Sequence, residues 1–475
     1  MRICLIDPET RFGDPPLGLA YIAAHLRQKI KDVDIEIIEK KSEKQILNEI
    51  KGFSPDIIGI TSVSKIYYLA KSIAKKIRKI FPKVQLVIGG IHITTSPNSF
   101  DKSPFDIAVV GEGEITFTEL IKSYKDSFKN IDKVKGLLIR KNGKILFTGR
   151  RKLLNLDILP MPAFDLLNMD YYLTPKLCES GLKIKLSLIT SRGCPYNCSF
   201  CNSANIWERR VRFHTPHYVV KMIKKYIEEY KVDIIDIYDD LFSLDTVRLR
   251  EIIILMKQER LLGKVNFEIQ ERTNLFSEEK AELLKELGVT AIAFGIETAS
   301  PKILNYLKGD NITVKDHQKA IDLAKKYRFN INAYFMVGNP YETKEDLGRT
   351  YNFIKKNNLI GSIFFQTVPF PGTKIWDYAI KKKIINKNFY ENKPPEIKWG
   401  YDLPIPEADL NMLLSKEITK EEFIGALRKF RELIGKGNKK LPYKQLLKFK
   451  NLKYLFDKRM LKKIWRYKGV IIKRL

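Results

Sequence analysis

Cysteine is scarce in this chain, with five residues in 475, and three of the five lie within eight positions. So few cysteines argue against a disulfide framework and favour metal or redox chemistry in a reducing compartment. The chain also lacks an apolar run of the roughly 18 to 20 residues that span a bilayer. Its N-terminus lacks the charged-then-apolar order of a signal peptide. We therefore expect a cytoplasmic protein of two or three domains.

Acidic residues are few beside the basic ones, and the net charge is +30. Nearly half of this excess lies in residues 436–475, where fifteen Lys or Arg accompany the single acid Asp457. Leucines interleave with these cations, which predicts a basic helical C-terminal region that could lie on an anionic membrane surface. A solvated helix packed on the protein's own surface explains the pattern as well, and nucleic acid is a less favoured partner.

The first 150 residues alternate short apolar runs with helical periods, which predicts an α/β fold. Strands are expected at 2–7, 34–39, 56–61, 84–90 and 106–114, and helices at 17–29, 43–51, 65–80 and 114–128. We expect residues 1–150 to form a Rossmann-like, doubly wound parallel sheet, with a hairpin at 136–149 around Asn142-Gly143. Its ligand should lie outside the carboxyl ends of the strands.

A second alternation follows a proline-containing linker at 151–184. Strands are expected at 183–191, 233–240, 265–274, 289–297, 329–338 and 363–370. Six strands joined by helices predict a partial (β/α)6 barrel over 185–375, with its chemistry on the loops after the strands. Residues 376–475 are expected to form a helical, basic extension, in which 393–410 is a candidate lid.

Three cysteines, Cys194, Cys198 and Cys201, follow the first strand of this second alternation. Structural zinc sites take four ligands, so zinc is the weaker interpretation. Cys4 and Cys178 could each add a fourth thiolate, but each is more simply a small buried residue. A [4Fe-4S] cluster held by only three thiolates leaves one iron open for substrate.

With Phe200 before the last cysteine, this motif resembles the radical S-adenosylmethionine (SAM) enzymes. The segments 288–300, 334–343 and 368–376 are similar to the fourth, fifth and sixth strand segments of that family. The resemblance implies that the open iron binds SAM and that one electron cleaves SAM to a 5'-deoxyadenosyl radical.

The resemblance suggests that Glu297, Asn332 and Tyr334 contact SAM. The other candidates for SAM contact are Phe200 of the cysteine motif, one of Asp239 and Asp240 at the end of the second strand, and Arg272. Glu297 could instead cap a helix, and Tyr334 could fill the barrel. Glu268, Gln270 and Arg272 alternate along the third strand and should share one face. Arg272 could bind a carboxylate of SAM or substrate, or pair with Glu268 or Glu297.

The front domain resembles the cobalamin-binding domain of B12-dependent radical SAM enzymes, on the segments 15–26, 55–61, 88–92 and 109–114. A dinucleotide is disfavoured because no G-x-G-x-x-G follows the first strand. The resemblance suggests that cobalamin is contacted by Ser62, Ser64, Gly89, Gly90, His92, Gly111 and Glu112.

Each of these front-domain contacts has a structural alternative. A loop histidine such as His92 could simply hydrogen-bond to the backbone, and Glu112 and Glu114 could cap the next helix. The chain has "DPPLG" at 14–18, without the histidine with which related domains replace the lower ligand of cobalt. His25 falls inside a predicted helix, where packing is its expected role.

Together the two resemblances imply a cobalamin-dependent radical SAM enzyme that methylates an unactivated carbon or phosphorus through methylcobalamin. They also imply a flavodoxin- or ferredoxin-type electron donor. A small-molecule substrate is expected, and the basic C-terminal region would suit a lipid or isoprenoid. The alternatives are a B12-dependent cyclase or rearrangement enzyme, an RNA-modifying methylthiotransferase, and a non-catalytic iron-sulfur electron carrier.

Overall fold

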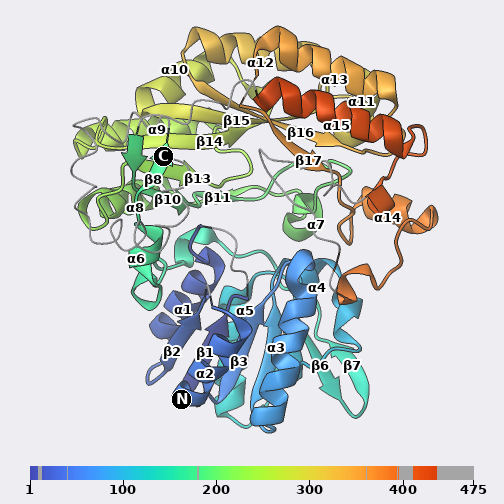
Figure 1. Ribbon diagram of the computed structural model, residues 1–475. Coiled ribbons are helices and arrows are strands. Elements are labelled where there is room, and N and C mark those ends of the chain that lie inside the picture. Colours follow the sequence, from blue (N-terminus) through green and yellow to red (C-terminus); the bar gives the residue numbers. More distant parts are fainter. Residues whose placement is uncertain are drawn as a thin grey trace, which may run out of the picture. The chain divides into compact units, whose positions relative to one another are not determined.

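The computed structural model describes residues 1–8, 13–39, 41–178, 181–359, 361–392, 394 and 410–435 (Figure 1). Its contacts form two compact units that alternate along the sequence. Unit 1 comprises Met1–Asn168, Gly193–Arg212 and Val368–Glu396, and unit 2 comprises Met169–Arg192, Phe213–Thr367 and Ile397–Leu475. The predicted domain bounds stay a prediction. The basic region 436–475 lies outside the described residues, as does nearly all of the candidate lid.

Unit 1 is built on a seven-stranded sheet with the order β2-β1-β3-β4-β5-β6-β7. The strands are β1 (Arg2–Ile6), β2 (Asp34–Ile38), β3 (Ile57–Thr61), β4 (Gln85–Gly89), β5 (Ile107–Val109), β6 (Leu137–Lys141) and β7 (Lys144–Phe147). The first five run parallel, which confirms the predicted doubly wound sheet. The predicted hairpin is β6–β7, and it extends the same sheet antiparallel to β5.

Helices cover both faces of this sheet, so its strands are near-continuous apolar runs. α1 (Leu17–Lys29) and α5 (Gly113–Lys125) pack together, and α2 (Glu43–Phe53) packs on α3 (Tyr67–Ile80). Isoleucines of α2 and α3 share one apolar cluster with the strand residues Ile58, Leu86 and Ile88. Cys4 is a fully buried member of that cluster, as the alternative to metal binding predicts.

Unit 2 contains a six-stranded parallel sheet with the order β10-β13-β14-β15-β16-β17. The strands are β10 (Lys185–Leu188), β13 (Ile234–Ile237), β14 (Asn266–Glu271), β15 (Val289–Glu297), β16 (Asn330–Val337) and β17 (Ile363–Gln366). The sequential order confirms the predicted partial barrel, because each strand joins the sheet beside the one before it.

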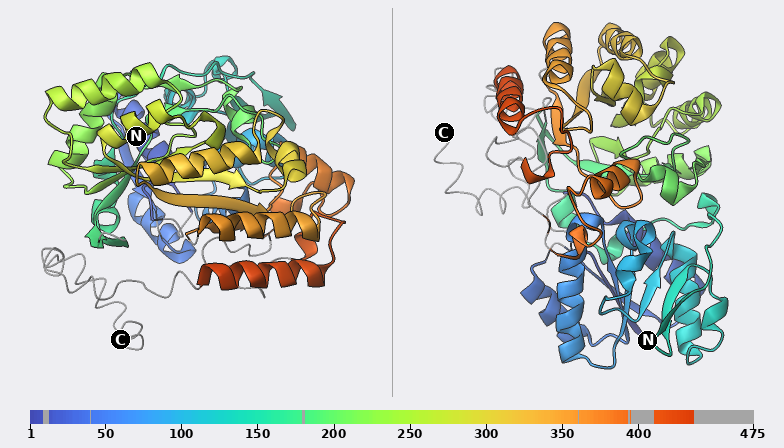
Figure 2. Two further views of the ribbon diagram at one scale, coloured as in Figure 1. Left: turned by 90° about the horizontal axis from the view of Figure 1, so that it is seen from above. Right: turned by 90° about the vertical axis from the view of Figure 1, so that its right-hand side faces the viewer.

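The helices of unit 2 lie along the sheet in an arc (Figure 2). They are α8 (Pro216–Glu228), α9 (Thr246–Gln258), α10 (Glu278–Leu287), α11 (Pro301–Lys308), α12 (Val314–Lys326), α13 (Lys344–Asn357) and α15 (Lys420–Gly435). A side-chain hydrogen bond caps the start of most of them. Thr313 and Thr343 open capping boxes, with Asp316 and Asp346 three residues further on. None of the helices in the described ranges is long and apolar enough to cross a membrane.

Smaller elements surround the two sheets. They are α4 (Ile91–Thr95), α6 (Met169–Tyr172), β8 (Lys176–Cys178), β9 (Gly181–Lys183), β11 (Ser191–Arg192), α7 (Ser203–Trp207), β12 (Arg212–Phe213) and α14 (Lys374–Lys381). The β8–β9 hairpin falls in the predicted linker, where the sequence analysis expected no strand.

Gly90 closes the turn from β4 into α4 and has a φ of +95°. A Cβ built there would lie 2.7 Å from both the Ser62 carbonyl oxygen and the Thr61 hydroxyl. The same carbonyl accepts the His92 amide at 3.0 Å. The turn therefore requires glycine, because backbone approaches where a side chain would begin.

Replacing Gly90 by alanine should destabilise the protein by about 2 kcal/mol or more, through the strained φ and the clash. Gly89→Ala is the matched control, because its Cβ would first meet Val109 at 3.8 Å. The measurement is the urea midpoint of unfolding of each full-length variant. Equal midpoints for the two variants would contradict this account.

Candidate functional site

The three clustered cysteines lie in one loop of unit 1, and each side chain is half-buried. A turn inside the loop brings the Cys201 amide to the Cys198 carbonyl at 3.1 Å. The Ser203 amide donates a hydrogen bond to the Cys201 sulfur at 3.4 Å. Gly193 begins the loop with a φ of +106°, and any Cβ there would collide with the Arg210 carbonyl. The loop therefore closes on itself and has an amide directed at one sulfur.

This donor set fits an iron-sulfur cluster. Thiolates are the ligands of such clusters, and hydrogen bonds to sulfur adjust their potential. Ser199, between two of the cysteines, is buried, and its hydroxyl has no hydrogen-bond partner in the described structure. That hydroxyl is a polar group available to a buried cofactor. Across the described ranges, no three His, Cys, Asp or Glu side chains form a site for a single metal ion.

Asp239 organises the chain just before the cysteine loop, within unit 2. Its side chain is 1% exposed. One carboxylate oxygen accepts the Thr190 amide at 2.6 Å, and the other accepts the hydroxyls of Thr190 and Ser191 at 2.5 and 2.7 Å. Burial raises the pKa of Asp239, while these donors and Arg248 oppose the rise. Asp239 therefore holds Thr190 and Ser191 in place, whereas Asp240 beside it is exposed.

Arg248 links the two ends of the cysteine loop. It extends from α9 and donates to the Thr190 carbonyl at 3.0 Å and to the His214 carbonyl at 3.1 Å. The His214 amide also donates to the Thr190 carbonyl at 2.9 Å. Thr190 and His214 flank the loop in the sequence, so Asp239 and Arg248 fix both of its stems. Arg248 was not predicted from the sequence, where its only signal is a cation on an otherwise apolar face of α9.

Glu112 is one of the predicted cobalamin contacts, and its alternative role was to cap α5. The structure contradicts the capping role, because no side-chain cap bond forms there. The carboxylate instead receives both terminal nitrogens of Arg212, at 2.9 and 3.1 Å. Arg212 ends the cysteine loop. Within unit 1, this ion pair thus joins the loop after β5 to the cysteine loop.

His92 is fully enclosed at the carboxyl edge of the front sheet. Its two ring nitrogens face the hydroxyls of Ser64 at 3.0 Å and Ser99 at 3.1 Å. Tyr67 lies against the ring, with centroids 4.1 Å apart. Burial, with a smaller contribution from Lys71, lowers the pKa of His92 to about 3. His92 is therefore a neutral, packed side chain. Its ring bonds hydroxyl groups, whereas the structural alternative predicted a hydrogen bond to the backbone.

The other predicted front-domain contacts lie along this same edge. Ser62 is buried, and its amide donates to the Gly89 carbonyl at 3.1 Å. Gly111 has a φ of +89° and open space where a Cβ would stand. Two apolar side chains that the sequence analysis missed, Val63 and Ile91, are 39% and 46% exposed there. The edge thus presents glycine backbone and apolar surface, which suits a large flat ligand.

His25, by contrast, is buried inside α1 and bonds Thr118 at 2.8 Å, which confirms that it is packed.

In unit 2, Glu297 stands at the end of β15 with a φ of +65°. Its carboxylate pairs with Lys308 of α11 at 3.1 Å, and Lys308 also donates to the Gly295 carbonyl. The alternative that Glu297 caps a helix is wrong, since Ser300 caps α11. Strained residues at strand ends often belong to functional sites. Lys308 was missed because only the fold brings α11 back over the strand.

Arg272 does not continue the predicted polar row along β14. The strand ends at Glu271, and both Glu271 and Arg272 are buried, so the alternation stops at Gln270. Glu268 pairs with Lys185 at 2.8 Å. The guanidinium of Arg272 donates to Asn274 at 2.9 Å and reaches the Lys308 carbonyl at 3.5 Å. Arg272, Lys308 and Glu297 therefore gather at neighbouring strand ends, and the pairing of Arg272 with Glu268 or Glu297 stays a prediction.

The remaining predicted contacts are half-buried. Asn332 and Tyr334 share one face of β16, and the Tyr334 ring meets Phe365 edge-on at 5.7 Å. Phe200 lies in the cysteine loop of unit 1. Asp239, Arg272 and Glu297 end adjacent strands of one sheet, so the fold brings these three to one edge.

Glu342, which the sequence analysis did not single out, shapes the turn after β16. It is buried and accepts the amides of Gly338 and Asn339 at 2.6 and 3.2 Å. Thr367, after β17, donates to the Asn339 side chain at 2.6 Å. Burial raises the pKa of Glu342 to about 7. This carboxylate thus ties the ends of two strands together.

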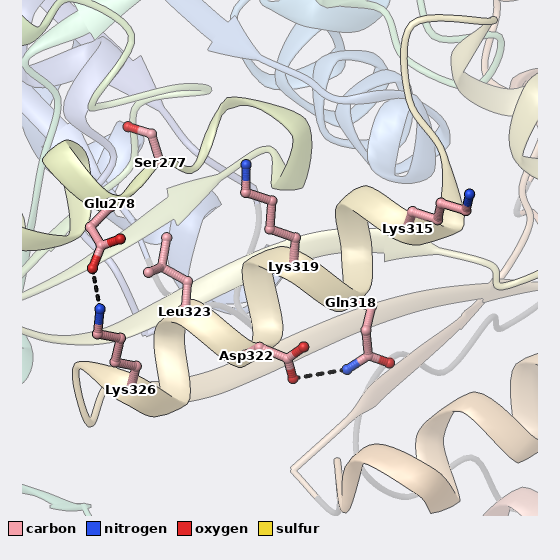
Figure 3. Close-up of a pocket in the computed structure, with 8 residues that line it drawn as sticks. All are labelled: Ser277, Glu278, Lys315, Gln318, Lys319, Asp322, Leu323 and Lys326. Carbon is pink, nitrogen blue, oxygen red and sulfur yellow. Dashed lines mark hydrogen bonds and ion pairs between the residues drawn. The ribbon is translucent and has the colours of Figure 1, made fainter.

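A groove of about 640 Å³ lies along α12 and the start of α10 (Figure 3). None of the predicted site residues lines it. Lys326 pairs with Glu278 across it, and Gln318 donates to Asp322 at 2.9 Å. Its polar side chains thus largely bond one another, and we assign it no role.

A parallel half-barrel with a three-cysteine loop after its first strand defines a radical SAM enzyme. The carboxyl edge of the front sheet offers a site for a second cofactor. Comparison with known families agrees. The radical SAM superfamily matches residues 188–354, and the B12-binding domain matches residues 11–121. The chain belongs to the radical SAM superfamily, among the members with a B12-binding domain. Its cofactors are a [4Fe-4S] cluster, SAM and cobalamin, as the sequence predicted.

Individual relatives extend this assignment. The chain is 33% identical to an uncharacterized methyltransferase of Pyrococcus horikoshii, over 100% of this chain and 97% of that protein. It is 28% identical to the anaerobic magnesium-protoporphyrin IX monomethyl ester cyclase of Cereibacter sphaeroides, over 74% of this chain and 59% of the cyclase. The solved methyltransferase TsrM of Kitasatospora setae has the same fold, with a TM-score of 0.66 at 18% identity, over 80% of this chain and 75% of TsrM.

Asp239→Ala should lower the affinity of the loop for iron by roughly 10-fold or more, because three donors that shape its first stem lose their acceptor. Asp240→Ala is the matched control and should keep the iron content of the wild type. Iron and sulfide are measured after anaerobic reconstitution and challenge with a chelator. Equal retention in the two variants would show that the loop does not depend on Asp239.

Each of Cys194→Ala, Cys198→Ala and Cys201→Ala should abolish the cluster, because each removes one of three thiolate ligands. Cys178→Ala should retain it, since Cys178 lies on β8 and burial raises the pKa of its thiol. The checks are iron content and the electron paramagnetic resonance signal of the reduced protein. Loss of the signal in Cys178→Ala would identify a fourth ligand instead of an open iron.

Proposed function

We propose that this enzyme methylates an unactivated carbon or phosphorus centre of a small molecule, with SAM and cobalamin as cofactors. The proposal rests on which segments of the chain belong to unit 1. The cysteine loop and the glycine-rich edge of the front sheet belong to one compact unit, joined by Glu112 and Arg212. A radical centre and a methyl carrier that serve one substrate must be held together in this way. The methyltransferase of Pyrococcus horikoshii supports the same reaction class.

When bound, the cluster and SAM supply a carbon radical, and cobalamin carries the methyl group. The chain's own residues bind and orient these groups. The three thiolates hold iron, and Asp239 and Arg248 fix the stems of their loop. Arg272, Lys308 and Glu297 form a charged group at the barrel edge, which suits the amino and carboxylate groups of an amino acid such as the methionyl part of SAM.

The apolar edge of the front sheet, with Val63 and Ile91, would face the corrin and exclude water from it. His92 is occupied by two hydroxyls, and its low pKa keeps the ring neutral. We propose that it shapes the edge and does not bind cobalt. Cobalt would then keep its own base or have no protein ligand below, as the missing histidine at 14–18 suggests.

A second candidate is a radical rearrangement or cyclisation without methyl transfer. It is favoured by the 28% identity to the magnesium-protoporphyrin cyclase, which extends over 74% of this chain. The cofactors would be the same in both reactions. Only the fate of the substrate radical differs.

The external partners remain proposals. An electron donor of flavodoxin or ferredoxin type would reduce the cluster. A lipid or isoprenoid substrate, and contact of a cytoplasmic enzyme with a membrane, would rest on the basic region 436–475. Liposome binding that persists after deletion of that region would remove the support for membrane contact.

The test is anaerobic reconstitution with iron, sulfide and cobalamin, followed by assays for S-adenosylhomocysteine and 5'-deoxyadenosine in the presence of SAM and a reductant. Methyl transfer predicts that both products form, because one SAM gives its methyl group and another is cleaved. 5'-Deoxyadenosine alone would favour the rearrangement reaction. The Cys198→Ala variant is the control and should release no 5'-deoxyadenosine. No SAM cleavage by the reconstituted wild type would favour an electron carrier.

A further inference from the structure

Glu112 and Arg212 form an ion pair with the geometry of a specific clamp. Two terminal nitrogens of Arg212 meet the two oxygens of Glu112, at 2.9 and 3.1 Å. Their side chains are only 16% and 6% exposed, for Arg212 and Glu112 respectively. Paired hydrogen bonds of this kind are directional as well as strong, and sheltering protects them from screening by salt.

The segment around Leu154 completes the clamp. The Leu154 amide donates to Glu112 at 3.0 Å, and its carbonyl accepts Arg212 at 2.7 Å. Arg212 also lies over the Trp207 ring, at 5.4 Å from its centroid. The guanidinium is therefore fixed from the front domain on one side and from the cysteine loop's own helix α7 on the other.

A second set of contacts ties the same two regions. Arg150 donates to the Asn205 carbonyl of α7 at 2.8 Å, and Asn205 donates to the Gly372 carbonyl at 2.5 Å. On the front-domain side, the Gly111 amide donates to Thr94 of α4 at 3.0 Å. α4 lies against α7. The loop that holds Gly111 and Glu112 cannot shift without disturbing the segment that follows the three cysteines.

Glu112 would ordinarily serve as the cap of α5, where a carboxylate is stabilised by free amides. Its carboxylate turns away from the helix to meet Arg212. Gly111, directly before it, is the residue whose missing side chain leaves open space at the proposed corrin edge. The ion pair therefore connects Glu112, which lies next to Gly111 at the proposed cobalamin edge, to Arg212 at the end of the cysteine loop.

We infer that the Glu112–Arg212 pair couples the two cofactor sites, so that cobalamin at the front edge stabilises the cluster loop and the cluster in turn strengthens cobalamin binding. The inference rests on the proposed function, which assigns the Gly111 loop to cobalamin. Such coupling is reciprocal by thermodynamic necessity. Glu112 and Arg212 are thus positioning residues for the cluster and the corrin.

The test measures binding without turnover. Hydroxocobalamin affinity is determined by anaerobic equilibrium dialysis with cluster-free and with reconstituted wild-type protein. We expect the cluster to tighten cobalamin binding by about fivefold or more. Bound cobalamin should slow the loss of iron to a chelator. In Glu112→Gln, which removes the charge but keeps an acceptor for the Leu154 amide, the gain in cobalamin affinity and the slower loss of iron should both largely disappear.

Further variants distinguish the loss of the Glu112–Arg212 ion pair from nonspecific destabilisation of the protein. Arg212→Lys keeps the charge but cannot form the fork, so it should lose most of the coupling too. Glu119→Gln is the matched control. Glu119 lies on α5, the helix that follows Glu112, and forms a separate ion pair with Arg151. It should couple as the wild type does. The double variant Glu112→Gln/Arg212→Lys should lose no more of the mutual effect between cluster and cobalamin than either single variant, because both substitutions remove the same interaction. Thermal unfolding shows that each variant is folded.

The outcomes separate this inference from the proposed function. Wild-type protein that binds both cofactors with no mutual effect overturns the inference and leaves methyl transfer intact. Coupling that persists in both Glu112→Gln and Arg212→Lys also overturns it. Wild-type protein that takes up no cobalamin contradicts the proposed function and the inference together. Coupling without methylated product supports the inference and contradicts methyl transfer.

Discussion

Three thiolates must be held in a short loop that has little regular structure of its own, and the rest of the molecule can be understood from that constraint. The loop contributes a tight turn at Cys198–Cys201 and an amide directed at the Cys201 sulfur. Its stems are fixed from outside by two buried side chains: Asp239 accepts an amide and two hydroxyls of Thr190 and Ser191, and Arg248 donates to two backbone carbonyls. A buried carboxylate is costly unless donors surround it, so this arrangement is stable only in one geometry.

Parallel sheets account for where the chemistry lies. In both units the parallel strands end at one edge, and the loops beyond that edge carry the polar and glycine residues. In unit 2, Asp239, Arg272 and Glu297 come together because their strands are neighbours. In unit 1, Ser62, Gly90 and Gly111 line a common edge for the same reason. The two edges differ in character, since one is charged and the other has half-buried glycines and the exposed apolar side chains of Val63 and Ile91.

Much of the fold could be predicted from sequence because strands and helices leave local periodic signals. The strands of both sheets and the hairpin at Asn142-Gly143 were predicted close to their observed positions. The β8–β9 hairpin was missed, since its strands are three residues long. For the site, the spacing of the cysteines is a local signal. The partners of Glu112, Glu297 and Asp239 are 100, 11 and 49 residues away, so no local pattern identifies them.

The sequence by itself determined the class of enzyme, because the cysteine spacing, the alternating strands and the glycine loops are properties of neighbouring residues. Only the tertiary structure decided what the charged side chains do. Glu112 meets Arg212 instead of capping its helix, Arg272 leaves the strand row, and His92 is enclosed by hydroxyls and Tyr67. The physical reason is that a buried charge or ring takes the partner that packing brings to it, and packing joins segments far apart in the chain.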